Sequence, residues 1–168
     1  YFRFYYGGTD GRFRANAGTG FYNTGSGAAT LDEGSTADTN KLILDMPIAA
    51  YSSDVVELKF SYTDHADADN DGDKVWIRGS YSDPWIEIYD LAPTTIQDGV
   101  YTDVGGLFIN QLLAGAGQTL TNEFQIMFGQ SGYSDASSTT GYDGITFDDI
   151  EVKVPACPVP FDFELAEV

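Results

Sequence analysis

The sequence is short of cysteine, of basic residues and of long apolar runs. Its single cysteine, Cys157, excludes an intrachain disulfide, so stability has to come from the core, from a metal ion or from partner chains. Only 8 Lys and Arg stand against 26 Asp and Glu, and a chain with a net charge of −18 is repelled by nucleic-acid phosphates and anionic membrane surfaces. No apolar run approaches the ~20 residues of a membrane span. We therefore expect neither nucleic-acid binding nor membrane insertion.

Histidine and catalytic motifs are equally scarce. His65 is the only histidine, and its place beside Asp64 in an acidic loop favours a hydrogen-bonding strut over a catalytic base. Cys157 lies between prolines, with no basic neighbour to activate its thiol. The sequence contains no phosphate-binding glycine loop and no dinucleotide fingerprint. A hydrolase with two carboxylates stays open because acids are abundant, but no pair stands out, and we predict that the chain is not an enzyme.

What the sequence does contain indicates an all-β domain. Tyr and Phe, with 11 residues each, are strand formers, and the 19 Gly suit tight turns between strands. A length of 168 residues fits one domain with one core.

Alternating apolar residues predict about ten strands. The clearest case is 55–63, where Val56, Leu58, Phe60 and Tyr62 share one face. Residues 107–113 are expected to form a short helix or an irregular turn. The other predicted strands are 1–6, 12–16, 27–32, 40–46, 74–79, 85–89, 100–104, 118–128 and 145–154. This series predicts a two-sheet antiparallel β-sandwich of the jelly-roll type.

The two ends differ from the middle of the chain. We divide the sequence into an N-terminal strand extension (1–9), a jelly-roll sandwich (10–154), a proline-rich linker (155–160) and a C-terminal strand (161–168). The three prolines of the linker exclude a central strand, because proline lacks the N–H that a ladder needs. The chain begins with Tyr1 and not with Met, so we interpret it as a processed mature protein or as a segment of a longer one.

An aspartate-rich loop at 64–73 predicts a calcium site. Alternating carboxylates followed by Gly72 fit the opening of a calcium loop, and calcium takes roughly 6 to 8 oxygen ligands. Arg78 stands where an EF-hand needs a closing Glu, so a distant segment has to complete the shell. The alternative is a solvated acidic turn, and magnesium fits less well because its octahedral shell is stricter. The loop ligands would be Asp64, Asp67, Asp69, Asp71 and Asp73.

The distant ligands are expected from Asp148 and Asp149, near the end of the sandwich. Neighbouring residues of a strand point to opposite faces, so one of the two should face inward and need a cation or several donors. Either residue would then close the calcium shell. The alternative is an edge strand whose inward charge blocks aggregation.

Several stretches together resemble a known kind of module. They are Phe60-Ser-Tyr-Thr-Asp-His65, 73–79, 85–91, Phe124-Gln-Ile-Met-Phe-Gly-Gln130 and Asp143-Gly-Ile-Thr-Phe-Asp-Asp-Ile150. The match covers about residues 10–154 and is similar to the MAM-like and carbohydrate-binding jelly rolls of secreted surface proteins from Bacteroidetes-type bacteria. The resemblance implies a jelly-roll fold, an extracellular or cell-surface location, and a structural Ca²⁺ held by Asp148 or Asp149 with Asp73.

Our main functional hypothesis is a calcium-stabilised structural or adhesive subunit of an extracellular filament. An amphipathic strand beyond a linker can add to the open sheet edge of a neighbour, and head-to-tail contacts of this kind build a homopolymer by strand exchange. The alternative is that the terminal strand pairs within its own domain. The residues expected at subunit contacts are Phe161, Phe163, Leu165, Phe2 and Phe4.

Two other functions stay open. A carbohydrate-binding module would present aromatic side chains that stack on sugars, and the main candidates are Trp85, Tyr81 and Tyr133. Tyr89 is a further candidate, whereas the alternation of Trp76 with Val75 and Ile77 assigns one face of that strand to the core. The third possibility is a passive spacer domain of a large adhesin.

Overall fold

The computed structural model describes residues 2–6, 11–16, 22–32, 38–65, 70–91, 100–132 and 144–154. These residues contain ten strands, one α-helix and one short 3-10 helix. The strands are β1 (Phe2–Tyr6), β2 (Arg12–Asn16), β3 (Ala28–Asp32), β4 (Asp38–Met46), β5 (Glu57–Asp64), β6 (Lys74–Arg78), β7 (Ile86–Asp90), β8 (Thr102–Phe108), β9 (Phe124–Gly132) and β10 (Ile145–Lys153). The helices are η1 (Ala49–Tyr51) and α1 (Ile109–Gly115).

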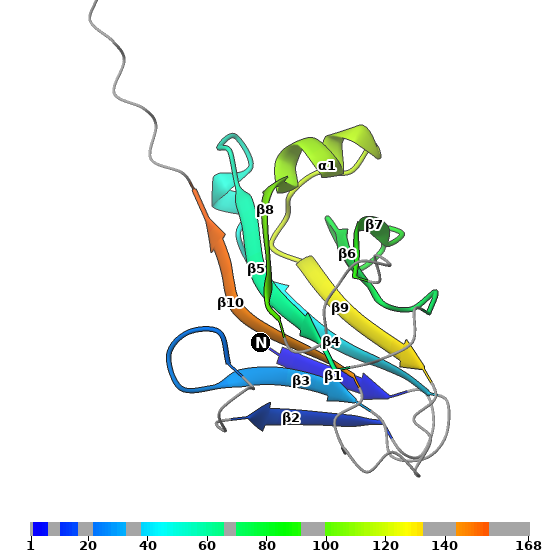
Figure 1. Cartoon of the computed structure of the whole chain (residues 1–168). Helices are drawn as coiled ribbons and strands as arrows, with labels where there is room; N and C mark the ends of the chain where they lie inside the picture. The colour runs from blue at the N-terminus through cyan, green and yellow to red at the C-terminus, as the bar shows by residue number, and fades with distance from the viewer. Residues whose placement is uncertain are drawn as a thin grey trace, which may run out of the picture.

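The strands form two five-stranded antiparallel sheets that pack face to face (Figure 1). Sheet A has the strand order β1-β4-β9-β6-β7, and sheet B has the order β2-β3-β10-β5-β8. The chain changes sheet at most of its connections, so strands that are neighbours in a sheet are distant in sequence. This arrangement confirms the predicted all-β, two-sheet sandwich.

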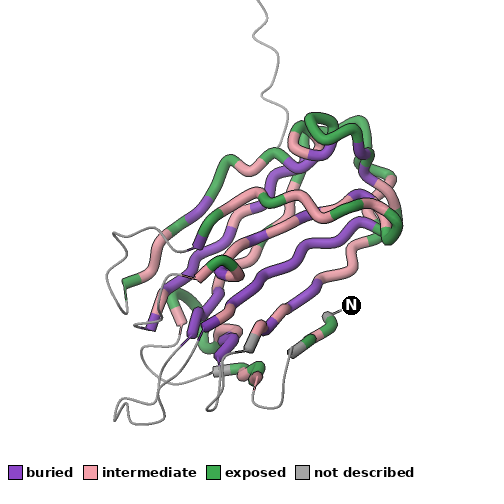
Figure 2. Tube along the Cα trace, turned by 90° about the vertical axis from the view of Figure 1, so that its right-hand side faces the viewer, coloured by how far each residue is buried: buried purple, intermediate pink, exposed green. Residues whose placement is uncertain are grey.

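The core lies between the sheets and is built by the alternation of strand side chains. Phe60 of β5 lies edge-to-face against Tyr89 and Phe128 of sheet A, with ring centroids 5.7 and 5.3 Å apart. Its ring also meets Tyr62 and Phe147 of its own sheet, at 6.1 and 6.4 Å. Figure 2 shows the buried residues along the central strands. The aromatic cluster therefore joins the two sheets where no disulfide does.

One end of the sandwich is covered by α1 (Figure 1). Ile109 and Leu113 of this helix are buried, and the Ile109 N–H donates to the Val56 carbonyl oxygen at 2.8 Å. The sequence predicts a short helix or a turn over 107–113, and the structure places the helix two residues later. The preceding strand is shifted in the same direction, because β8 pairs with β5 as far as Phe108.

The first strand belongs to the sandwich and is not an extension outside it. β1 forms the edge of sheet A and pairs with β4 over five residues, from Phe2 opposite Leu44 to Tyr6 opposite Asn40. Phe4 is half-buried and packs against the core. A contact of Phe2 and Phe4 with a second subunit stays a prediction, as does the role of 155–168, which lies outside the described residues.

No helix within the described ranges is long and apolar enough to span a bilayer.

Candidate functional site

The outer face of sheet A gathers polar and aromatic side chains from strands that are far apart in sequence. Strand pairing aligns them in rows across the sheet, because residues opposite each other on adjacent strands are side-chain neighbours. Tyr5 lies opposite Lys41, which lies opposite Gly129. A second row runs from Ile43 to Met127 to Trp76, and a third runs from Asp45 to Gln125 to Arg78.

A groove of about 400 Å³ lies on this face. Its apolar floor is formed by Ile43 and Met127, which are only 8% and 4% exposed although they point away from the core. Larger side chains surround these two residues and reduce their exposure. They come from β1, from β4 and from the 79–85 loop that precedes β7. The lining residues are Tyr5, Thr39, Lys41, Ile43, Arg78, Trp85 and Met127.

The loop at 79–85 carries two of the aromatic side chains and is anchored by hydrogen bonds from the 118–123 segment. The Gln118 side chain accepts from the Gly79 N–H and donates to the Pro84 carbonyl oxygen, both at 2.8 Å. The Thr121 hydroxyl donates to the Gly79 carbonyl oxygen at 2.5 Å. The prediction of a strand over 118–128 is therefore wrong for its first half, because these polar residues bond to a loop and not to a sheet.

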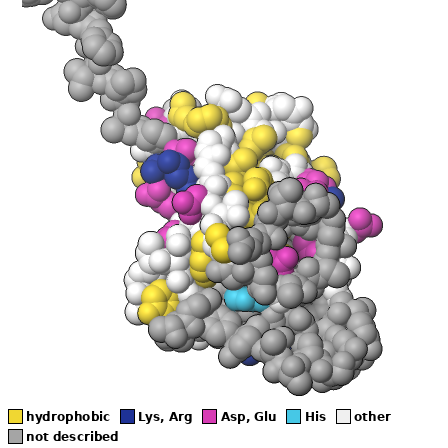
Figure 3. Space-filling view, viewed as in Figure 1, with side chains coloured by type: hydrophobic (Ala, Val, Ile, Leu, Met, Phe, Trp, Pro, Cys, Tyr) yellow, Lys and Arg dark blue, Asp and Glu magenta, His cyan; other side chains and the backbone are white. Residues whose placement is uncertain are grey.

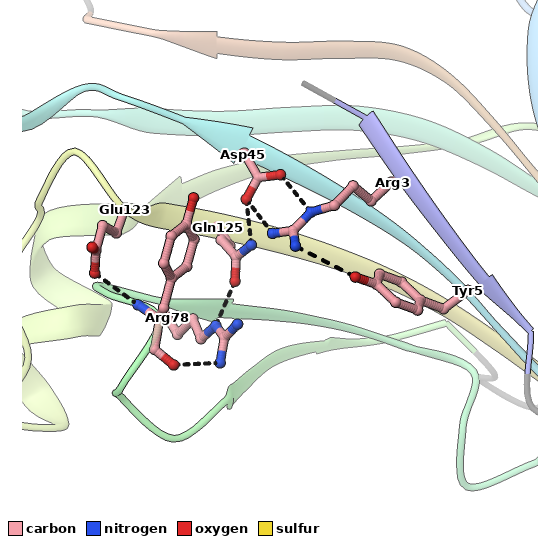
Figure 4. A network of polar contacts seen from close by, with 7 residues as sticks. Arg3, Tyr5, Asp45, Arg78, Glu123 and Gln125 are labelled. Carbon is pink, nitrogen blue, oxygen red and sulfur yellow. Dashed lines mark hydrogen bonds and ion pairs between the residues drawn. The ribbon is translucent and has the colours of Figure 1, made fainter.

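Arg78 is held between aromatic rings and neutral acceptors. Its guanidinium carbon lies 4.4 Å from the Trp85 ring centroid and 5.9 Å from that of Tyr81. Nε donates to Gln125 Oε1 at 2.5 Å, and Nη1 donates to the Tyr81 carbonyl oxygen at 3.0 Å (Figure 4). A cation stacked on a ring in this way is attracted by the ring quadrupole, which fixes the plane of the guanidinium.

An ion pair continues this network toward β1 (Figure 4). Arg3 donates to both carboxylate oxygens of Asp45, at 2.7 and 2.6 Å, and to the Tyr5 hydroxyl at 3.4 Å. The Gln125 amide also donates to Asp45. Burial raises the pKa of Asp45, but the hydrogen bonds from Arg3 and Gln125 outweigh it and hold the pKa below the usual 3.8. The carboxylate stays ionised and is neutralised locally by Arg3.

Two of the predicted sugar-stacking residues, Tyr81 and Trp85, thus lie beside the groove. Tyr81 is 51% exposed, and Trp85 lines the groove. The third, Tyr133, lies outside the described residues. Tyr89 packs into the core against Phe60 and is not available on this face.

Trp76 lies on the groove side of β6, because Val75 and Ile77 are the buried residues of that strand, as the alternation predicts. Its ring covers Gly129: a Cβ at that glycine would lie 2.6 Å from Trp76 Cζ3. The direct partner of Trp76 on β9 is Met127, so Gly129 is a diagonal neighbour, and the indole fills the space that a side chain at Gly129 would occupy.

The sequence did not single out Tyr5, Lys41 or Arg78 for this site. Tyr5 is 47% exposed, at the edge of sheet A. Their only sequence signal is an outward position on an alternating strand, which says nothing about which strands are adjacent.

Of the predicted calcium ligands, Asp67 and Asp69 lie outside the described residues, Asp71 is exposed, and Asp73 is buried. Asp73 accepts the Ser131 N–H at 2.6 Å and the Asn70 N–H at 2.9 Å. Burial raises its pKa to about 6, against the effect of these bonds, and the charge of Asp64 adds to the rise. A neighbouring cation would relieve this cost, so Asp73 fits a calcium ligand on chemical grounds.

Asp148 and Asp149 have partners elsewhere. Asp148 accepts the backbone N–H groups of Asn23 and Thr24 at 2.7 and 3.1 Å, and Asp149 accepts the Asn23 amide and the Thr24 hydroxyl. The expectation that one of the two faces inward is wrong. The register shifts between Asp148 and Glu151, and Asp149 adopts a φ of 50°, so a bulge turns both side chains outward.

Among the residues that the structure describes, no three His, Cys, Asp or Glu side chains gather into a metal site. The calcium prediction therefore depends on whether Asp67 and Asp69 join Asp64, Asp71 and Asp73, and it stays a prediction.

His65 has the structural role that the sequence favours. Its Nε2 lies 2.7 Å from the Thr146 hydroxyl, which in turn lies 2.7 Å from the hydroxyl of Thr30. The backbone N–H of His65 also donates to Gly144 at 3.0 Å. The side chain is 9% exposed and is the cyan patch in Figure 3. This chain of bonds ties β5, β10 and β3 together.

Comparisons with known proteins find solved structures with a similar fold. No protein-family model matches the chain, and no curated protein matches its sequence. The CBM22-1 xylan-binding domain of Paenibacillus barcinonensis Xyn10C matches with a TM-score of 0.52 and 12% identity, over 92% of this chain and 87% of that one. A structure that concerns the promiscuous specificity of carbohydrate-binding modules of the β-sandwich superfamily matches with a TM-score of 0.51 and 15% identity, over 90% of this chain and 56% of that one.

The two-sheet fold of this chain is therefore similar to that of these two β-sandwich structures, and the jelly-roll fold that the resemblance in the sequence implies is confirmed. At this level of identity the likeness concerns the fold, and function has to be argued from the site.

Proposed function

We propose that this protein is a non-catalytic carbohydrate-binding module and that the groove on sheet A is its glycan site. The observation that carries the proposal is the groove itself, where Tyr5 and Trp85 flank an apolar floor on one sheet face and Tyr81 lies beside it against Arg78. Aromatic rings offer flat apolar surfaces to the C–H faces of sugar rings, and binding sites combine such surfaces with a few fixed polar groups.

The polar groups around the floor suit sugar hydroxyls. Arg78 lines the groove and is held in one network with the buried Gln125 and with Asp45, so its guanidinium is oriented before a ligand arrives (Figure 4). Groups that are already ordered lose less conformational entropy on binding. The two structural neighbours are carbohydrate-binding modules, and this supports the same function for the present fold.

Binding without hydrolysis fits the composition of the groove. Glycosidases commonly use a pair of carboxyl groups at the scissile bond. Among the described residues that line the groove, none is Asp or Glu. We prefer this function to that of a filament subunit, because the main subunit contacts predicted for a filament lie in 155–168, outside the described residues.

The proposal is tested with soluble polysaccharides in affinity gel electrophoresis, followed by titration calorimetry on those that retard the protein. Trp85→Ala and Tyr5→Ala should each abolish or strongly weaken retardation. Tyr51→Ala is the matched control, because Tyr51 is as exposed as Tyr5, at 47%, but belongs to η1 and does not line the groove.

Retention of binding in both groove variants would refute the assignment of the site. Failure of the unmodified protein to bind any glycan of a broad array would refute the function.

A further inference from the structure

The basic residues of this chain differ in whether they form an ion pair with a carboxylate. All eight lie in the described residues, and six of them pair with a carboxylate. The pairs are Arg3 with Asp45, Arg12 and Arg14 with Asp32, Lys59 with Glu57, Lys74 with Glu87, and Lys153 with Glu151. Within the described part of the chain, Lys41 and Arg78 have no carboxylate partner, although the chain has 26 acids.

These two cations line the same groove. Among the described residues, Arg78 donates to two neutral acceptors, the Gln125 amide oxygen and the Tyr81 carbonyl oxygen, and no described carboxylate pairs with it. Lys41 stands between Tyr5 and Gly129, which bring no charge. The network contains two carboxylates: Asp45 is neutralised by Arg3, and Glu123 accepts the backbone N–H of Tyr81 at 3.3 Å. In a chain with a net charge of −18, the two charged side chains among the described residues that line the groove are therefore both positive.

The distance between Lys41 and Arg78 indicates a ligand longer than one sugar residue. Lys41 is on β4 and Arg78 on β6, with β9 between them, and their partners on β9 are Gly129 and Gln125. Two strand spacings across the sheet and an offset of four residues along it place the Cα atoms of Lys41 and Arg78 roughly 16 Å apart. That span is too long for one sugar ring, so the cations would meet different residues of one glycan chain.

We propose that the groove recognises an acidic polysaccharide, with Arg78 and Lys41 each binding the carboxylate of a uronic acid residue. The proposal deepens and rests on the carbohydrate-binding function. Arg78 suits a carboxylate because its planar fork is already fixed by Trp85 and Gln125, and a fixed guanidinium pairs with a carboxylate through parallel N–H bonds. Lys41 acts as a mobile point charge at the other end of the apolar floor.

The test uses polygalacturonate, alginate and glucuronoxylan, each compared with the same polymer after reduction of its carboxyl groups to neutral sugars. At least one acidic polymer should bind about tenfold more tightly than its reduced form, because hydrogen bonds to charged groups exceed those to neutral groups by this order. Titration calorimetry at fixed ionic strength measures both affinities.

Lys41→Gln should remove most of the preference for the acidic polymer. Lys153→Gln is the control, because it changes the net charge equally at the end of β10, on sheet B. Thermal melts of both variants verify that the fold is retained.

Three results would overturn the inference. Equal affinity for the acidic and the reduced form of every polymer that binds would refute the acidic ligand but leave the carbohydrate-binding function intact. An equal loss in Lys41→Gln and Lys153→Gln would indicate a net-charge effect and refute the role of the groove. Binding to neither form of any polymer, together with an empty glycan array, would refute both proposals.

Discussion

Phe60 lies at the centre of the aromatic cluster, and its truncation tests how the two sheets are held together. The ring is 2% exposed and contacts two rings of sheet A and two of sheet B. The surrounding strands are fixed by their ladders, so a cavity at this position cannot collapse easily. Phe60→Ala should therefore reduce the free energy of unfolding by about 4 kcal/mol, within the usual range of ~3–5 for buried Phe.

The expected effect is large enough to measure by two methods. For a domain of this length, 1 kcal/mol changes the melting temperature by about 2–4 °C, so Phe60→Ala should lower it by roughly 8–16 °C. Urea denaturation, followed by the fluorescence of Trp76 and Trp85, should show a lower midpoint with an unchanged slope. Phe60→Leu keeps most of the volume and should lose less than about 1.5 kcal/mol, which gives a measurement if the Ala variant does not fold.

Phe13→Ala is the matched control, because Phe13 is 41% exposed and its ring meets that of Phe4 at the edge of the sandwich. It should cost no more than about 1 kcal/mol. Glycan affinity, measured well below the melting temperature, should be unchanged in Phe60→Ala, because the groove occupies the opposite face of sheet A. An equal loss of stability in the Phe60 and Phe13 variants would refute the reasoning.

Three further predictions concern the groove sheet and the aspartate loop. Gly129→Ala should cost about 1–3 kcal/mol and change the fluorescence of Trp76, because the new Cβ meets the indole ring; an unchanged melt and spectrum would contradict this. The pKa of Asp45 is lowered on folding, so its ion pair with Arg3 stabilises above the usual pKa of 3.8 and is lost as the pH falls through the lower folded value. Melting temperatures of the unmodified protein and Arg3→Gln should therefore differ at neutral pH and converge in acid, and a constant difference would refute the assignment. If the loop at 64–73 binds calcium, a hundredfold excess of the ion over its dissociation constant should stabilise by about 2.7 kcal/mol, and a chelator that leaves the melting temperature unchanged would exclude the site.

Much of the fold could be predicted because strand alternation is local. The 55–63 segment shows the period of two directly, and in β5 it buries Leu58, Phe60 and Tyr62 as expected. The boundary of β9 could not be predicted, because the polar residues before it form contacts with a loop. Gln118 and Thr121 look compatible with a strand, but their side chains bond to Gly79 and Pro84.

The pair Asp148-Asp149 illustrates a different limit. Alternation requires adjacent residues to face opposite ways, and this rule fails at a bulge. At this bulge the two carboxylates accept hydrogen bonds from Asn23 and Thr24, which lie more than a hundred residues earlier. No local pattern contains that information.

The sequence by itself determined the all-β class, the strongly acidic surface and the absence of an intrachain disulfide. It also identified Trp85 and Tyr81 as aromatic candidates for sugar binding. Only the tertiary structure decided that these rings meet Tyr5, Lys41 and Arg78 at one groove. The physical reason is that a strand's sequence tells which of its side chains share a face, whereas the sheet order β1-β4-β9-β6-β7 follows from packing across the whole chain.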